Sequence, residues 1–304
     1  MHVSKTSLVG AVVSVGLLVP ASALAANFVG GPQSERLRGT NFADTMDGNG
    51  GNDHIRGRGG NDAITGGTGN DRVFGGNGID VITGGTGNDR VFGGKGNDVI
   101  TGVQGNDWLN GGNGDDAITG DANNTGDLTS FDRIFGANGN DTLRGGDSRD
   151  RIRGGNGNDT SFGESGNDHM AGGTGNDTQG GGAGNDTIFA NLGVDVTNGG
   201  DGNDTLWAQA RGDVAGGPGV DQVGDTINGG EGDDVIRTRD GEVDRISCAG
   251  GNDRALLDHV DVIIGATAAD PKGGCEMVVR KAPKADDSKS EDNQQAVADE
   301  KKQG

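Results

Sequence analysis

Large apolar residues recur in this sequence at every ninth position, and each one stands two places after an aspartate. The stretch from Gly66 to Thr101 shows the pattern most clearly, as GGTGNDRVF, GGNGIDVIT, GGTGNDRVF and GGKGNDVIT. The six residues GGxGxD predict a turn, because glycine adopts positive φ at low cost, and the last three residues predict a short strand with one inward side chain. A fixed period on this scale is typical of a solenoid.

Alternate nonapeptides resemble each other more than neighbours do. In one set the three residues after the aspartate are Ala-Ile-Thr or Val-Ile-Thr (63–65, 81–83, 99–101, 117–119). In the other set they are Arg-Val-Phe (72–74, 90–92). Two nonapeptides then close one coil of eighteen residues, and repeats two apart stack on the same edge about 4.8 Å from each other. We therefore predict an all-β fold, a right-handed parallel β-roll (β-solenoid) of 18-residue coils with two nonapeptides per coil.

This stacking would bring the aspartates of successive coils together in columns. Two carboxylates about 5 Å apart repel each other by roughly 3 kcal/mol at an effective dielectric constant near 20. Basic side chains are scarce at the turn positions, where Arg58 and Lys95 are nearly alone. A hard divalent cation would balance the charge, and Ca²⁺ accepts six to eight oxygen ligands, whereas Mg²⁺ demands a tighter octahedron and keeps its waters.

The tandem pattern GGxGxDxUx, where U is a large apolar residue, resembles the haemolysin-type calcium-binding repeat of the RTX family, from about Gly48 to Asp234. The resemblance implies a parallel β-roll with multiple Ca²⁺ ions held between stacked turns, each ion bound by backbone carbonyls and an aspartate from each of two turns. Carried onto this chain, one site would use Gly66, Thr68 and Asp71 from one turn. The next turn would supply Gly85, Gly87 and Asp89.

The aspartates that the resemblance marks as metal ligands all end a glycine-rich turn. They are Asp53, Asp62, Asp71, Asp80, Asp89, Asp98, Asp107, Asp116, Asp141, Asp159, Asp168, Asp177, Asp186, Asp204, Asp221 and Asp234. Carbonyl ligands are expected from residues such as Gly66, Thr68, Gly75, Asn77, Gly85, Gly87, Gly94 and Gly96.

The chain divides by composition and by the phase of the repeat. Residues 1–25 read as a cleaved secretory signal, with an apolar run too short to span a bilayer and an Ala-Leu-Ala cleavage site; an uncleaved membrane anchor is the alternative. We expect a lead-in and N-terminal cap at 26–47, a first repeat block at 48–120, a loop insertion at 121–131 and a second, more degenerate block at 132–236. A C-terminal cap at 237–280 and a disordered tail at 281–304 complete the prediction. The alternative at 121–131 is a break into two separate rolls.

Polar residues replace the inward apolar residue at three positions of the second block, Ser161, Gln179 and Thr197. Because these are eighteen apart, we expect one wall there to pack less well or to hold water. Cys248 and Cys275 are the only cysteines, and in a chain bound for an oxidising compartment we expect them to form a disulfide.

Composition restricts the possible functions. Glycine accounts for 65 of 304 residues, tyrosine is absent, and the net charge is −21, which argues against nucleic acid or an anionic membrane as partner. No transmembrane segment is expected. Neither H-E-x-x-H nor G-x-S-x-G occurs, so we predict no catalytic residue and no enzyme activity.

The predicted function is that of a secreted, extracellular calcium-binding repeat protein whose β-roll folds on binding multiple Ca²⁺ ions. The alternative is a calcium-dependent adhesion, interaction or extracellular-matrix protein that uses the roll as a scaffold for an unidentified cell-surface or matrix partner. Outward threonines (Thr65, Thr83, Thr101, Thr119) would form a column like that of ice-binding solenoids, but those require a broad flat double array, and strand propensity explains the threonines better.

Overall fold

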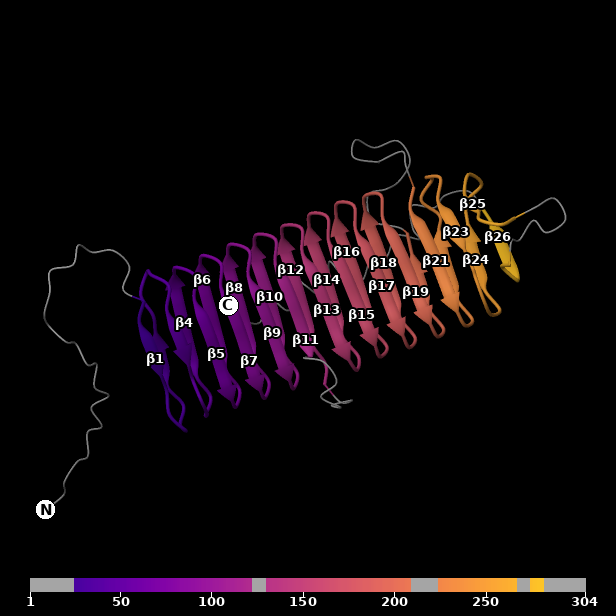
Figure 1. Cartoon of the computed structure of the whole chain (residues 1–304). Helices are drawn as coiled ribbons and strands as arrows, with labels where there is room; N and C mark the ends of the chain where they lie inside the picture. Colours follow the sequence, from indigo (N-terminus) through magenta and orange to yellow (C-terminus); the bar gives the residue numbers. More distant parts are fainter. Residues whose placement is uncertain (1–24, 122–129, 209–223, 267–273, 282–304) are drawn as a thin grey trace, which may run out of the picture.

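The computed structural model describes residues 25–121, 130–208, 224–266 and 274–281. In these residues the chain forms two parallel sheets of 13 strands each and no helix, so none of the described residues lies in a helix that could cross a membrane. Successive strands alternate between the sheets and stack along one long axis (Figure 1). The predicted all-β parallel solenoid is confirmed.

One sheet contains the odd-numbered strands in order. They are β1 (Asn27–Val29), β3 (Thr45–Asp47), β5 (Ala63–Thr68), β7 (Val81–Thr86), β9 (Val99–Gln104), β11 (Ala117–Asp121), β13 (Thr142–Asp147), β15 (Thr160–Ser165), β17 (Thr178–Ala183), β19 (Val196–Asp201), β21 (Thr226–Glu231), β23 (Arg245–Ser247) and β25 (Val262–Ile263).

The other sheet contains the even-numbered strands. They are β2 (Arg36–Arg38), β4 (His54–Gly59), β6 (Arg72–Asn77), β8 (Arg90–Lys95), β10 (Trp108–Asn113), β12 (Arg133–Asn138), β14 (Arg151–Asn156), β16 (His169–Thr174), β18 (Thr187–Leu192), β20 (Thr205–Trp207), β22 (Val235–Thr238), β24 (Arg254–Leu257) and β26 (Met277–Arg280).

Register follows the eighteen-residue period. Ile64 pairs with Ile82 in one sheet and Val73 with Val91 in the other, so identical side chains stack directly above each other. These inward residues are at most 2% exposed, while their neighbours on each strand face outward. The core is therefore a narrow double file of aliphatic side chains, one from each sheet per 18-residue coil.

The strands are longer than predicted. Most contain six residues, because the first half of the glycine-rich turn also pairs with the next coil, as Gly67 does with Gly85 and Thr68 with Thr86. The expectation that all of GGxGxD is turn was therefore wrong. Positive φ, 114° at Gly67 and 118° at Gly69, bends the chain while the backbone of the residues between stays within the ladder.

Two interruptions of the nine-residue spacing leave both sheets continuous. Leu109 pairs with Ile134 across residues 122–129, and Leu206 pairs with Ile236 across residues 209–223. Both bypassed segments lie outside the described residues, and the second contains the motif that ends at Asp221. One unbroken roll therefore runs through both blocks.

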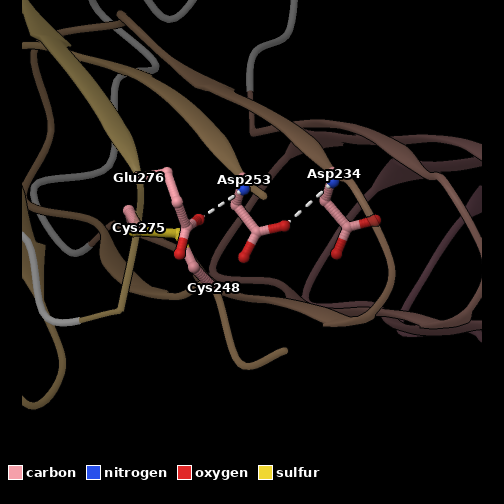
Figure 2. The surroundings of a disulfide bond; sticks show 5 residues. All are labelled: Asp234, Cys248, Asp253, Cys275 and Glu276. Carbon is pink, nitrogen blue, oxygen red and sulfur yellow. Dashed lines mark hydrogen bonds between the residues drawn. A yellow bond between two sulfur atoms is a disulfide. The ribbon is translucent and has the colours of Figure 1, made fainter. Parts of the chain in front are cut away.

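Pairing extends into the segments named as caps. Strand β1 already pairs with β3 within 26–47, and β23 to β26 continue the two sheets within 237–280. Cys248 and Cys275 join in the predicted disulfide beside these last coils (Figure 2). Nearly all of the predicted signal sequence and tail falls outside the described residues.

The three polar residues of the second block point into the core from β15, β17 and β19. Ser161, Gln179 and Thr197 are 1%, 2% and 1% exposed. Their side-chain polar atoms have no hydrogen-bond partner in the described part of the chain. An unsatisfied buried polar group costs about 1–3 kcal/mol, so this column is a weak point of an otherwise aliphatic core.

Replacing these polar groups with apolar ones of similar shape should stabilise the roll. We expect Thr197→Val to raise the free energy of unfolding by about 1 kcal/mol, because the methyl group needs no hydrogen bond. The shift in the urea midpoint at saturating calcium measures it. Thr178→Val, on the exposed face of neighbouring β17, is the matched control and should change little; a destabilised Thr197→Val protein would contradict the interpretation.

Candidate metal sites in the stacked turns

An aspartate ends each turn, immediately before the strand, and its side chain links two coils. The Oδ1 atom of Asp71 accepts a hydrogen bond from the backbone N–H of Asp53, one coil earlier, at 2.7 Å, and Asp89 accepts one from Asp71 at 2.8 Å. Near the end of the roll the same series of hydrogen bonds links Asp234 to Asp253 and Asp253 to Glu276 (Figure 2).

These bonds form two columns, one along each edge of the roll. One contains Asp53, Asp71, Asp89, Asp107, Asp132, Asp150, Asp168, Asp186, Asp204, Asp234 and Asp253. The other contains Asp44, Asp62, Asp80, Asp98, Asp116, Asp141, Asp159, Asp177, Asp195, Asp225 and Asp244.

The second carboxylate oxygen, Oδ2, is buried and lacks a hydrogen-bond partner in the described part of the chain. This holds for every predicted aspartate ligand that the structure describes, from Asp53 to Asp234; Asp221 lies outside the described residues. Each of these side chains is at most 3% exposed. A buried charged oxygen without a partner is costly, so the columns require a compensating group.

At most turns a carbonyl oxygen from the next coil lies near Oδ2, beside the first glycine of the motif. A Cβ atom at Gly57 would lie closer than 3.0 Å to both Asp62 Oδ2 and the Gly75 carbonyl oxygen. Gly66 faces Asp71 Oδ2 and the Gly84 carbonyl in the same way. Oxygen atoms of two stacked turns thus converge at the first glycine of each motif, which is the donor chemistry that Ca²⁺ prefers.

Carbonyl direction corrects the expected pairing of turns. The Gly87, Gly94 and Gly96 carbonyls lie against the following coil, whereas the Asn77 carbonyl accepts a hydrogen bond from Gly60 N–H in the preceding coil. Within each GGxGxD motif, the carbonyls of the first and third residues therefore face the preceding coil. Those of the second and fourth residues face the following coil.

The expected site took Gly66 and Thr68 from the earlier turn and Gly85 and Gly87 from the later one. In the structure these carbonyls face away from the space between the two turns. The Gly66 carbonyl and Asp53 Oδ2 lie together beside Gly48, and the Gly75 carbonyl and Asp62 Oδ2 lie together beside Gly57. A motif fixes which residues supply carbonyls, but the direction in which each points depends on the backbone path through the turn.

Burial and mutual repulsion disfavour the charged form of these carboxylates. Burial raises the pKa of Asp80 to about 6, of Asp89 to about 7 and of Asp107 to about 9. The accepted N–H bond opposes the rise, and neighbouring carboxylates add to it. None of the aspartates between residues 53 and 116 forms an ion pair with a described basic residue.

No group of three or more acidic, histidine or cysteine side chains is close enough to hold a metal in the described residues. A metal ion between two turns would therefore depend on backbone carbonyls for most of its ligands, with carboxylates completing the set. Six to eight such oxygens suit Ca²⁺, and the flexible geometry of Ca²⁺ tolerates ligands from two separate turns.

Sequence reasoning missed several members of the columns. Asp150, Asp225, Asp244 and Asp253 occupy the same positions although their turns have lost glycines or shifted in spacing. A signal was available, since Asp225 and Asp234 are nine apart, as are Asp244 and Asp253. Asp132 and Asp195 also belong to the columns and keep the nine-residue phase.

A family model described as the RTX calcium-binding nonapeptide repeat matches most of the roll. The matched residues are 29–64, 38–73, 65–100, 96–125, 129–161, 162–179, 181–206 and 224–255. A search of curated proteins found no significant match. Among solved structures, the chain is similar to a hyperactive, Ca²⁺-dependent, β-helical antifreeze protein from an Antarctic bacterium, with 20% identity, a TM-score of 0.41, and coverage of 83% of this chain and 95% of that one.

In the absence of divalent ions the roll should be most stable in mild acid. Folding raises the pKa of these carboxylates from near 4 to about 6 to 9, so the folded state holds protons more tightly. Their favourable contribution is complete below about pH 4 and is lost as the pH rises through the folded pKa values. Far-UV circular dichroism melts between pH 4 and 9, in buffer stripped of divalent ions, measure this; stability that increases with pH would contradict it.

Proposed function

Because the chain belongs to the RTX calcium-binding nonapeptide repeat family, we propose that its roll binds several Ca²⁺ ions between stacked turns and folds as they bind. The observation that carries this proposal is the pair of columns of buried Oδ2 atoms, most of which lie near a carbonyl oxygen from the next coil. Without cations these columns would oppose folding, and with cations they hold the coils together. The proposal assigns no catalysis to the roll.

The ligands proposed for one ion come from two consecutive turns of one edge. Asp71 Oδ2 and the forward-facing Gly67 carbonyl of one turn combine with the Gly84 carbonyl of the next. Each aspartate also holds the register through its Oδ1 bond to the preceding coil. The same side chain would therefore fix the coil spacing and complete the metal site.

We also propose that the protein acts outside the cell. The Cys248–Cys275 disulfide supports this, because disulfides persist in oxidising compartments. Extracellular calcium-binding modules are commonly weak, in the range of about 10⁻⁴–10⁻³ M, which suits a protein that encounters calcium only after export.

Calcium titration of the purified chain without its first 25 residues tests the proposal. We expect the far-UV signal to change from unordered to β as calcium is added, and isothermal calorimetry to record several ions with a large heat from coupled folding. Magnesium at the same concentration is the control and should produce little order. An ordered β spectrum and an unchanged melting temperature after complete chelation would refute the proposal.

Asp89→Asn separates the two roles of the carboxylate. Asparagine can still accept the N–H of Asp71 but carries no charge, so at pH 8 without metal we expect stability to rise by about 2–4 kcal/mol. Calcium affinity at the adjoining turns should fall at least tenfold. Asp115→Asn removes the same charge from an exposed turn position and should change neither quantity much.

A single direction of change for both quantities would contradict the assignment. If Asp89→Asn lost stability in the absence of metal, the carboxylate would be acting as a structural acceptor alone. If it kept full calcium affinity, the ions would have to be bound elsewhere.

A further inference from the structure

Basic charge is concentrated on one face of this acidic chain. Outward positions of the even-numbered strands carry Arg36, Arg38, Arg56, Arg72, Arg90, Arg133, Arg151, Arg153, Arg237 and Arg254. Beside the inward residue of these described strands no acidic residue stands at an outward position. The odd-numbered sheet mostly presents threonine and valine there, with Arg144 and Arg245 as its arginines. The net charge of −21 therefore conceals a strong segregation of sign.

A groove of about 550 Å³ runs along the edge of this face, where the turns meet the first residues of β6, β8, β10 and β12. Arg72, Arg90 and Arg133 line it, all exposed, together with Asn70, Asn88 and Trp108. None of the three arginines forms an ion pair with a described residue. A second hollow of about 210 Å³, lined by arginines of β2 and β4, lies on the same face nearer the N-terminus.

The donors of the groove follow each other along the axis of the roll. Arg72 pairs in register with Arg90, Arg90 with Trp108 and Trp108 with Arg133, so the side chains are one strand spacing apart, about 4.8 Å. Arg72 lies over the Phe74 ring at 5.1 Å, and Arg133 over the Phe131 ring at 5.0 Å, which limits their freedom before any ligand binds. A linear polymer with repeated anionic groups matches this row better than a single small anion does.

The aromatic rings of the face stack on one another. The Phe74 and Phe92 centroids are 5.0 Å apart with the planes 8° from parallel, and Trp108 and Phe135 are 4.9 Å apart. Single-stranded nucleic acid is held by bases that stack on free aromatic faces, and each of these rings already has one face against its partner. The groove instead offers hydrogen-bond donors and ring edges.

We propose that this groove binds an acidic polysaccharide along the axis of the roll. The guanidinium groups of Arg72 and Arg90, which are neighbours in register, share one carboxylate or sulfate group, and Arg133, two strands beyond Arg90, pairs with the next one. The Asn70 and Asn88 side-chain amides contact sugar hydroxyls. Charge complementarity selects the ligand class, and rings already stacked in pairs leave fewer faces for nucleic-acid bases. The concave surface favours a strand over a flat bilayer.

Calcium dependence of this binding rests on the proposed function. Asp71, Asp89 and Asp107 line the same groove as the arginines. Bound cations would neutralise these carboxylates and so remove a repulsion that faces any polyanion. The test therefore measures calcium binding and polysaccharide binding separately.

The experiment uses a fluorescein-labelled hyaluronan oligosaccharide as probe, with the folded full chain in saturating calcium, and neutral dextran as the uncharged comparison. We expect saturable binding that weakens with added salt, and a change in Trp108 fluorescence in a Trp207→Phe background. Arg72→Gln/Arg90→Gln should weaken binding at least tenfold with an unchanged circular dichroism spectrum. Arg144→Gln/Arg245→Gln removes the same charge from the opposite sheet and should weaken it less than twofold.

Three results would overturn the proposal. They are no binding of hyaluronan, equal losses in the two double variants, or tighter binding of a dT oligonucleotide or of phosphatidylglycerol vesicles than of hyaluronan. Calorimetric calcium titration of Arg72→Gln/Arg90→Gln should match the unaltered chain. A chain that orders without calcium but still binds hyaluronan would refute the proposed calcium-dependent folding. It would not contradict polysaccharide binding in the groove.

Discussion

Buried carboxylates stacked at one coil spacing are the constraint on which the rest of this roll depends. Each Oδ1 atom accepts the backbone N–H of the preceding coil, so the columns fix the register of both sheets. The same stacking leaves a row of charged Oδ2 atoms without partners inside the described roll. Glycine stands beside most of them, because a Cβ there would lie within 3.0 Å of Oδ2; Ala190 beside Asp195 and Cys248 beside Asp253 are exceptions. Register, glycine pattern and need for cations thus have one origin.

Because the core is narrow, the stability of the roll depends strongly on the carboxylate columns. Most nonapeptides contribute one fully buried aliphatic side chain, such as Ile82 or Val91, whereas a globular domain of this length would bury large aromatic clusters. Hydrophobic burial alone therefore provides little reserve against carboxylate repulsion. Where the core file turns polar, at Gln179 and its neighbours, the roll depends still more on the turns. Protonation of the turn carboxylates and cation binding to them, rather than the core, should govern when the chain is ordered.

The period made the coil, the core columns and the stacked aspartates predictable, because identical residues eighteen apart can only satisfy their pattern by stacking. Local spacing could not reveal that Asp225 succeeds Asp195, since thirty residues separate them and the bypass is visible in the strand pairing of the folded chain, as in β19 with β21. Nor could it give the directions of the turn carbonyls, which depend on the sign of φ at successive residues. The groove was also hidden, because Arg133 joins the row of Arg72, Arg90 and Trp108 only through its pairing with Trp108 across the bypassed segment.

Position in the repeat separates what the fold needs from what it leaves free. The aspartate, the glycines and the inward residue are fixed by packing, while the two outward residues of each strand lie on the surface and contact each other and the neighbouring coils. On one sheet those free positions hold threonine and valine, and on the other arginine and aromatic residues. Arg72 directly follows Asp71, so the cationic row and the carboxylate column are adjacent along the same edge. If cations at the column strengthen an anion on the row, thermodynamic reciprocity requires that anion to strengthen cation binding by the same factor.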